Sequence, residues 1–274
     1  MATIEDVARS ANVSIATVSR YINGRTLGMS PATKERLRIT IATLGYVPNA
    51  AARSLKTGRS RLIGVLIANI AHMYWSTMLE GIEDGCRAMG YTMLISSAGN
   101  DLETQDRYLR TLLNQNVAGL LINPVFADES TIAQWAAISQ PVIMLDRTYP
   151  ALRKPLVAID NGHGARLATQ HLIDYGHTDI GLISWEINSL SNRKERLDGF
   201  LSTLQESGLS IEPDRIAFAR ESWDDGVRAT REMFERANAP TAVFSANMEL
   251  NLQVLSGLRL LGLRVPRDVS VVGF

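Results

Sequence analysis

Residues 3–23 read TIEDVARSANVSIATVSRYIN and predict two short helices joined by a tight turn. Thr3 can cap the first helix, with Asp6 three residues later as its reciprocal partner. The first helix is expected to end at Asn12, because asparagine tolerates the left-handed conformation that a tight turn needs. Ser14 can then cap the second helix. Two short helices with about three turn residues between them are typical of a helix-turn-helix.

A third helix is predicted after this pair. Ser30 followed by Pro31 is a strong helix start, with the cap first and proline in the first turn. Gly45 is expected to end the helix. The inward-facing positions of the second and third helices at helical spacing are Val18, Ile22, Leu37, Ile41 and Leu44.

The outward face of the second helix has the composition of a DNA-reading surface. Its short hydroxyls suit phosphates, its small apolar groups suit thymine methyls, and its arginine suits guanine. A purely structural interpretation is also open, in which Ser14 only caps the helix and Arg20 is only solvated. The outward positions are Ser14, Ile15, Ala16, Thr17, Ser19 and Arg20.

A further short helix is predicted after Pro48, capped by Asn49 and ending before Gly58. A helix this short is marginally stable in water, because fewer than about 12 residues form too few hydrogen bonds to offset the free-energy cost of helix nucleation. We therefore expect it to form when a partner binds. Leu55, the one large apolar residue among alanines and bases, would suit a wedge between base steps in the minor groove.

The charge distribution also indicates DNA binding. The 274 residues hold 28 Lys and Arg against 28 Asp and Glu, yet the first sixty carry nine basic and three acidic residues, a net charge of +6, which leaves −6 for the rest. A basic arm on an acidic body is expected of a polyanion binder with a second function. A lone Cys86 excludes a disulfide framework. With no membrane-length apolar run and no secretory signal, the chain is expected to be cytoplasmic.

The body of the chain alternates between strand-like and helix-like segments. Alternating βα units predict an α/β fold of parallel sheets covered by helices on both faces, with ligands bound beyond the carboxyl ends of the strands. The predicted strands are 62–67, 91–96, 119–122, 141–146, 157–160, 179–184, 241–246 and 269–273. The predicted helices are 75–89, 102–115, 132–138, 162–175, 193–207, 224–237 and 249–261.

Polar and aromatic residues follow several of these strands. Aromatic faces stack on the C–H surface of a sugar while carboxylates and amides hold its hydroxyls, so this set indicates a polyhydroxy ligand. Tyr74 and Trp75 can instead cap the core, and Asp160 can instead cap the next helix. The residues after the strands are Tyr74, Trp75, Asp146, Arg147, Asp160, Asn161 and Asn247.

The order and spacing of three motifs resemble the lactose-repressor family of bacterial transcription regulators. The motifs are Thr3–Asn23, Gly45–Asn49 and Ala51–Leu55. The resemblance continues into the body, through Gly81-Ile-Glu, Arg196-Leu-Asp-Gly-Phe200 and Gly262-Leu-Arg-Val-Pro266. It implies a helix-turn-helix domain over 1–46, a hinge helix and linker over 47–60, and a two-lobed periplasmic-binding-protein-like core over 61–274.

The resemblance also implies roles for individual residues in DNA binding. The implied base readers are Ile15, Ala16 and Arg20. The implied phosphate contacts are Ser14, Thr17, Ser19 and Asn23. The hinge residues that would enter the minor groove are Ala52, Leu55 and Lys56. No contact is carried over for the 24–29 loop, which is about one residue longer than usual.

An effector site between the two lobes is implied in the same way. Arg196 would clamp a hydroxyl pair or a carboxylate, and Trp223 would stack on the ligand. The implied effector-binding residues are Tyr74, Trp75, Asp146, Asp160, Arg196, Trp223 and Asn247.

The function implied is a dimeric repressor of carbohydrate-metabolism genes that binds double-stranded DNA at a pseudo-palindromic operator and responds to a sugar or sugar derivative. No cofactor or metal is expected. The chain departs from the family pattern at Asn247-Met248, where Asn-Asp is common, and it stops at Phe274, before an expected acidic ligand contact. A truncated regulator that binds DNA without responding to an effector is therefore an alternative.

Two other classes fit less well. A dinucleotide-binding enzyme would need a glycine fingerprint, and the one candidate, Gly162-His-Gly164, lacks the third glycine or alanine at the required spacing. The four histidines are not spaced for a metal, and Asp224 and Asp225 point to different helix faces. A periplasmic solute-binding protein would share the fold of the body, but it would need an export signal and no basic helix-turn-helix.

Overall fold

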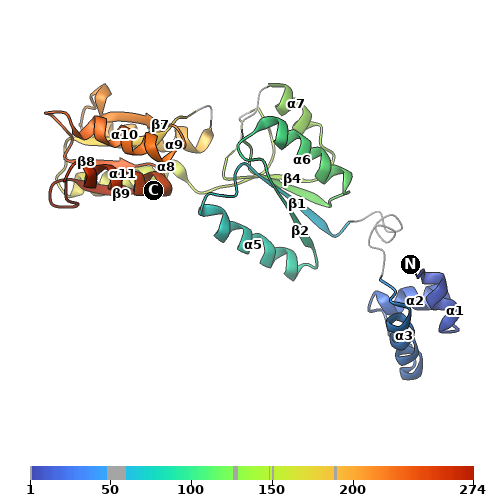
Figure 1. Ribbon diagram of the computed structural model, residues 1–274. Coiled ribbons are helices and arrows are strands. Elements are labelled where there is room, and N and C mark those ends of the chain that lie inside the picture. The colour runs from blue at the N-terminus through green and yellow to red at the C-terminus, as the bar shows by residue number, and fades with distance from the viewer. Residues whose placement is uncertain (1, 48–59, 126–128, 148, 150, 188–189) are drawn as a thin grey trace. The chain divides into compact units, whose positions relative to one another are not determined.

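The structure is a computed structural model that describes residues 2–47, 60–125, 129–147, 149, 151–187 and 190–274. The chain divides into two compact units, Met1–Ser60 and Arg61–Phe274. Each unit is built from its own elements (Figure 1). The hinge residues Asn49, Ala52, Leu55 and Lys56 lie outside the described residues.

Side-chain caps define the helices of the N-terminal unit, α1 (Ile4–Ser10), α2 (Ile15–Ile22) and α3 (Pro31–Leu44). The Asp6 amide donates to Thr3 Oγ1 at 3.2 Å, and the Thr3 amide donates to Asp6 Oδ2 at 2.9 Å, which completes a capping box. Asn12 has a φ of +49° in the turn, and Ser14 and Ser30 cap the next two helices. These local predictions are confirmed.

The core of this unit is small. Its fully or nearly fully buried residues come from α1, α2 and α3 and the turn after α1: Val7, Ala8, Ala11, Val18 and Leu37. The inward position predicted for Leu44 is wrong, because its side chain is 36% exposed at the end of α3, while Thr40 is buried instead. Since α3 is longer than α1 and α2, its last turn extends past the core.

The first lobe of the second unit is a parallel sheet of order β2-β1-β3-β4-β5. Its strands are β1 (Leu62–Ile67), β2 (Thr92–Ser97), β3 (Gly119–Ile122), β4 (Val142–Leu145) and β5 (Leu156–Val157). Successive strand residues point to opposite faces. Val65 and Ile67 therefore pack with α5 (Tyr74–Ala88), whereas Leu66 packs with α6 (Leu102–Asn114) and α7 (Glu129–Ala136) on the other face (Figure 1).

The second lobe repeats this plan with a parallel sheet of order β7-β6-β8-β9. Its strands are β6 (Ile180–Trp185), β7 (Ile216–Ala219), β8 (Ala242–Ser245) and β9 (Ser270–Gly273). Ile183 packs with α10 (Trp223–Phe234) and α11 (Met248–Leu260), and Leu182 packs with α8 (Asn161–Asp174) and α9 (Ser191–Glu206). The predicted α/β fold with parallel sheets is confirmed.

Several element boundaries differ from the prediction. Strand β7 and the short 3-10 turn before it, η1 (Pro213–Arg215), were not expected. The strand predicted over 157–160 is the shorter strand β5, which ends at Val157. Asp160 is not part of the sheet, because it caps α8. No helix in the described ranges is long and apolar enough to span a membrane.

Helices α8 and α9 approach each other closely at a glycine. A Cβ atom built on Gly199 would lie 2.5 Å from the carbonyl oxygen of Gly162 and 3.1 Å from the Ala165 Cβ. A backbone oxygen cannot move aside without displacing its helix. Gly199 therefore sets the position of α9, which carries several side chains of the site described below.

We predict that Gly199→Ala lowers the free energy of unfolding of the second unit by about 1–3 kcal/mol, as overpacking does. Gly85→Ala is the matched control, because Gly85 lies in α5 with no atom within 4 Å of its added Cβ. The control is expected to be neutral or stabilising by up to about 1 kcal/mol, since alanine is the better helix former. Thermal unfolding of both variants checks this, and equal midpoints would contradict it.

Candidate functional site

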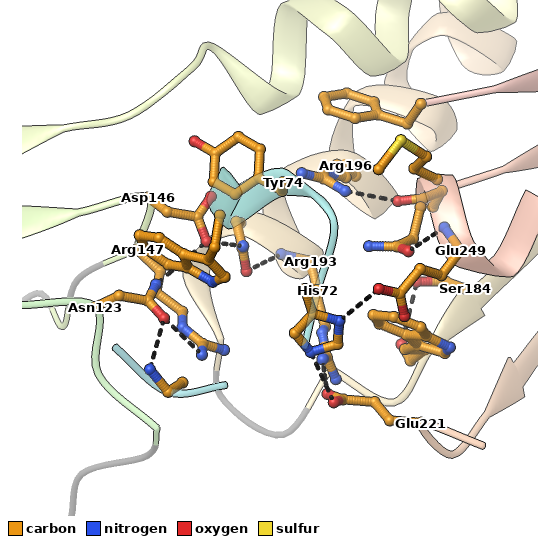
Figure 2. A pocket seen from close by; sticks show the side chains of 18 of the residues that line it. His72, Tyr74, Asn123, Asp146, Arg147, Ser184, Arg193, Arg196, Glu221 and Glu249 are labelled. Carbon is orange, nitrogen blue, oxygen red and sulfur yellow. Dashed lines mark hydrogen bonds and ion pairs between the residues drawn. The ribbon is translucent and has the colours of Figure 1, made fainter. Parts of the chain in front are cut away.

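A cavity of about 360 Å³ lies between the two lobes, where the carboxyl ends of both sheets meet (Figure 2). Every strand contributes side chains from its end or from the segment that follows. Ala68, His72, Tyr74 and Trp75 follow β1, Asn100 follows β2, Asn123 follows β3, Asp146 and Arg147 follow β4, and Ile159 follows β5. The second lobe adds Ser184, Trp185, Asn192, Arg193, Arg196, Glu221, Ala246, Asn247, Met248, Glu249 and Phe274.

Aromatic rings from both lobes face the cavity. Trp75 and Trp185 are 3% and 5% exposed, and Tyr74 packs edge-on against Trp75 with ring centroids 5.6 Å apart. Burial, with a smaller contribution from the nearby Asp146, raises the pKa of Tyr74, so its hydroxyl stays protonated and able to donate. Such rings offer flat surfaces to the C–H faces of a ligand.

Asp146 occupies a strained position at the end of β4. Its φ is +64°, in the left-handed region that residues other than glycine rarely adopt. Asn123 and Asn192 hold its carboxylate, donating to Oδ2 at 3.4 Å and 3.0 Å. Arg147 donates to Asn123 Oδ1 at 3.2 Å, and burial lowers the pKa of its guanidinium. Strain of this kind persists where surrounding bonds fix a side chain, and it concentrates at functional sites.

Arg196 is the most deeply buried charge in the cavity wall among the described residues, at 9% exposure. It donates from Nε to Asn161 Oδ1 at 2.9 Å and to the Ala246 carbonyl at 2.7 Å, and its guanidinium lies 3.7 Å from the Phe274 ring centroid. Burial lowers its pKa to about 10, which still leaves it charged at neutral pH. The side chain is thus fixed in place before any ligand binds.

A second charged cluster lies at the other side of the cavity (Figure 2). Arg193 donates to Glu221, and Asn100 donates to Glu221 Oε2 at 3.1 Å. Burial alone would raise the pKa of Glu221, but its contacts with His72 and Arg193 lower it to about 2. Glu221 is therefore ionised at every physiological pH. The cavity consequently presents aromatic faces together with hydrogen-bond donors and acceptors whose side chains are held in place by ion pairs and hydrogen bonds.

The structure brings together five of the seven predicted effector residues. Tyr74, Trp75, Asp146, Arg196 and Asn247 all line the cavity. Asp160 and Trp223 are not part of this lining, and their contacts with a ligand stay predictions. Asp160 caps α8, accepting from the His163 amide at 2.9 Å, and Trp223 is the first residue of α10 with its side chain 52% exposed.

Other cavity residues escaped sequence analysis. Glu221 lies two residues before Trp223, in the segment between β7 and α10. His72, Asn100, Asn123, Asn192 and Arg193 come from loops or helix starts without any pattern of their own. The rule that ligands bind beyond strand ends could have found Asn123, which directly follows β3.

The predicted DNA-reading face of α2 is largely open to solvent. Ser14, Ile15, Ala16, Arg20 and Asn23 are exposed, and Thr17 and Ser19 are half-buried. Arg20 donates to the Leu27 carbonyl at 2.8 Å, and Asn23 donates from its side chain to the Ser19 carbonyl at 2.7 Å. Their contacts with DNA stay predictions. Within the described residues, no cluster of His, Cys, Asp and Glu is arranged to hold a metal ion.

Comparison with protein families matches both units of the chain. Residues 3–49 match bacterial regulatory proteins of the lacI family, and residues 60–274 match periplasmic binding proteins and the sugar-binding domain of the LacI family. The HTH-type transcriptional repressor PurR of Aliivibrio salmonicida is 34% identical over all of this chain and 82% of its own length.

Solved structures give the same relationship. The lac repressor dimer bound to operator and the anti-inducer ONPF superposes with a TM-score of 0.85 at 29% identity, over 99% of this chain and 82% of that one. A complex of the transcriptional regulator CelR with cellobiose superposes with a TM-score of 0.70 at 31% identity, over 100% of this chain and 82% of that one.

Proposed function

Because this chain belongs to the LacI family of bacterial regulatory proteins, we propose that it is a transcriptional repressor of carbohydrate-metabolism genes whose affinity for DNA is controlled by a sugar or sugar derivative. The observation that carries the proposal is the cavity at the strand ends, in a chain that begins with a DNA-reading unit. Its aromatic faces and charge-held hydrogen-bonding groups suit a small polyhydroxy molecule.

DNA recognition is assigned to residues 1–46. Helix α2 would enter the major groove, with Ile15, Ala16 and Arg20 reading bases and Ser14 and Thr17 on phosphates. Residues 47–60 would form the hinge, with Leu55 as the minor-groove wedge. Two copies of the chain would pair through 61–274 and bind the two halves of a pseudo-palindrome, as the lac repressor dimer binds its operator.

Ligand recognition is assigned to the cavity residues of both lobes. Tyr74, Trp75 and Trp185 would stack on the sugar ring, while Asp146 and Arg196 would hold its hydroxyls. A ligand that binds one arrangement of the lobes better than another shifts the protein toward that arrangement. Coupling between the ligand and DNA is typically 1–3 kcal/mol and is reciprocal.

The proposal is tested in two steps with the purified chain. Sites selected from random DNA should be pseudo-palindromic, and fluorescence anisotropy should show sequence-selective binding to them. A panel of sugars, sugar acids and sugar phosphates is then screened by thermal shift, and each hit should change the affinity for the selected DNA. Absence of any selected site, or hits that leave DNA affinity unchanged, would contradict the proposal.

Arg20→Ala should weaken binding to the selected site by about 5- to 150-fold and relax base preference at one position of each half-site, as loss of a bidentate guanine contact does at 1–3 kcal/mol. Arg20→Lys keeps the positive charge but lacks the planar guanidinium that donates two parallel hydrogen bonds, so it should recover only part of the affinity. Arg9→Ala, an exposed residue of α1, controls for removal of a positive charge. A uniform loss across sequences would show that Arg20 does not read a base.

A further inference from the structure

A set of side-chain contacts crosses the cavity and ties the first lobe to the second. Asn192 of α9 donates to Asp146 at 3.0 Å, and Asn100 donates to Glu221 at 3.1 Å. His72, in the segment between β1 and α5, reaches two carboxylates of the second lobe (Figure 2). Among these contacts, those of His72 involve a group that can change its charge near neutral pH.

Both ring nitrogens of His72 face carboxylates. Nδ1 lies 3.0 Å from Glu249 Oε1, at the start of α11, and Nε2 lies 3.6 Å from Glu221 Oε2, in the segment after β7. Only the imidazolium has a proton on both nitrogens. In the neutral ring, one nitrogen lone pair faces a carboxylate oxygen, which is repulsive. The contact across the cavity therefore depends on the proton.

The charged groups that contact His72, directly or through Glu221, carry a net negative charge while its imidazole is neutral, and Asp146 and Arg147 of the first lobe add one charge of each sign. Glu221 and Glu249 bring two negative charges, and Arg193 of α9, bonded to Glu221, brings one positive charge. Strand β6 contributes the uncharged ring of Trp185, with its centroid 5.6 Å from the imidazole. The cluster is neutral with imidazolium and carries one negative charge without it. Glu221 contributes most to raising the pKa of His72, burial opposes it, and Glu249 raises it further.

We propose that His72 is a proton-dependent latch between the lobes: its imidazolium, held by Glu221 and Glu249, keeps the cavity closed, and loss of the proton releases it. A lower pH thus favours the closed arrangement in the absence of any ligand. Coupling of this latch to effector binding rests on the proposed function, and a ligand that prefers the closed lobes would bind more tightly at lower pH.

Tryptophan fluorescence of the whole chain reads out the latch directly. A protonated imidazole quenches a neighbouring indole, and His72 and Trp185 belong to different lobes. Without DNA or sugar, emission should rise with pH, with a midpoint above the ordinary histidine value of about 6.5. His72→Gln and Trp185→Phe should each abolish this fluorescence transition, and Glu249→Gln should lower the pH of its midpoint. The control is His163→Gln, an exposed position of α8, which should leave the transition unchanged.

Thermal unfolding gives an independent readout. A group whose pKa is raised on folding stabilises the protein below its unfolded pKa, and this contribution is lost as the pH rises through the folded pKa. The wild type should therefore exceed His72→Gln by about 2–4 °C near pH 6 and match it near pH 9. A fluorescence transition that survives in His72→Gln, or a midpoint at or below 6.5, overturns the latch. Because neither DNA nor sugar is present, failure of the proposed function leaves these results unaffected.

Discussion

Replacing Leu37 with alanine should unfold the N-terminal unit and abolish binding to the selected DNA site. Leu37 is fully buried among Val7, Ala8, Ala11 and Val18, which together form most of a small core. Removing a buried leucine side chain costs about 2–5 kcal/mol, because transfer energy is lost and a cavity remains. A unit this small has only a few kcal/mol of stability to lose.

Leu44→Ala is the matched control for this variant. Leu44 lies in the same helix, but its side chain is 36% exposed, and surface substitutions are usually within about 0.5 kcal/mol. Amide hydrogen exchange should show loss of protection over α1–α3 in Leu37→Ala alone. The second unit, with its own hydrophobic clusters, should keep its thermal transition in both variants. Retained operator binding by Leu37→Ala would contradict the role given to this core.

Replacing Arg196 with alanine should weaken effector binding by about 10- to 150-fold or more. Charge-assisted hydrogen bonds contribute about 1.5–3 kcal/mol each, and 1.4 kcal/mol corresponds to a factor of ten. Arg196 donates hydrogen bonds to Asn161 and to the Ala246 carbonyl, and these bonds fix the position of its guanidinium. The remaining N–H groups of the guanidinium can then bind the ligand. Isothermal titration with the sugar found in the screen measures the loss.

Two further variants separate ligand binding from stability. Arg196→Lys keeps the positive charge but cannot donate to both acceptors from a planar fork, so its affinity should fall between those of the wild type and Arg196→Ala. Arg166→Ala, which removes a partly exposed arginine paired with Glu206, should leave both the affinity and the thermal midpoint nearly unchanged, because solvent screens such surface pairs. Equal affinities of Arg196→Ala and Arg166→Ala would exclude Arg196 from the ligand site.

The local structure of the N-terminal unit could be predicted from the sequence. The capping box of Thr3 and Asp6, the turn at Asn12 and the caps at Ser14 and Ser30 involve residues at most three positions apart. Their hydrogen bonds form inside one turn of chain, so residue type and spacing suffice. Burial was harder to predict, since helix periodicity alone did not show that α3 extends past the core at Leu44.

The parallel sheets and part of the cavity were also predictable, for a physical reason. Alternating βα units place all strand ends on one side, and the residues that follow them must therefore gather there. This rule placed Tyr74, Trp75, Asp146 and Asn247 at the cavity. The same rule also selected Asp160, which does not line the cavity, while Arg196 and Trp223, which follow no predicted strand, came from the family resemblance.

Only the tertiary structure decided which side chains meet across the cavity. His72 and Glu249 are 177 residues apart in the chain, and Asn100 and Glu221 are 121 apart. Their contacts depend on the packing of two separately formed lobes, which no local pattern encodes.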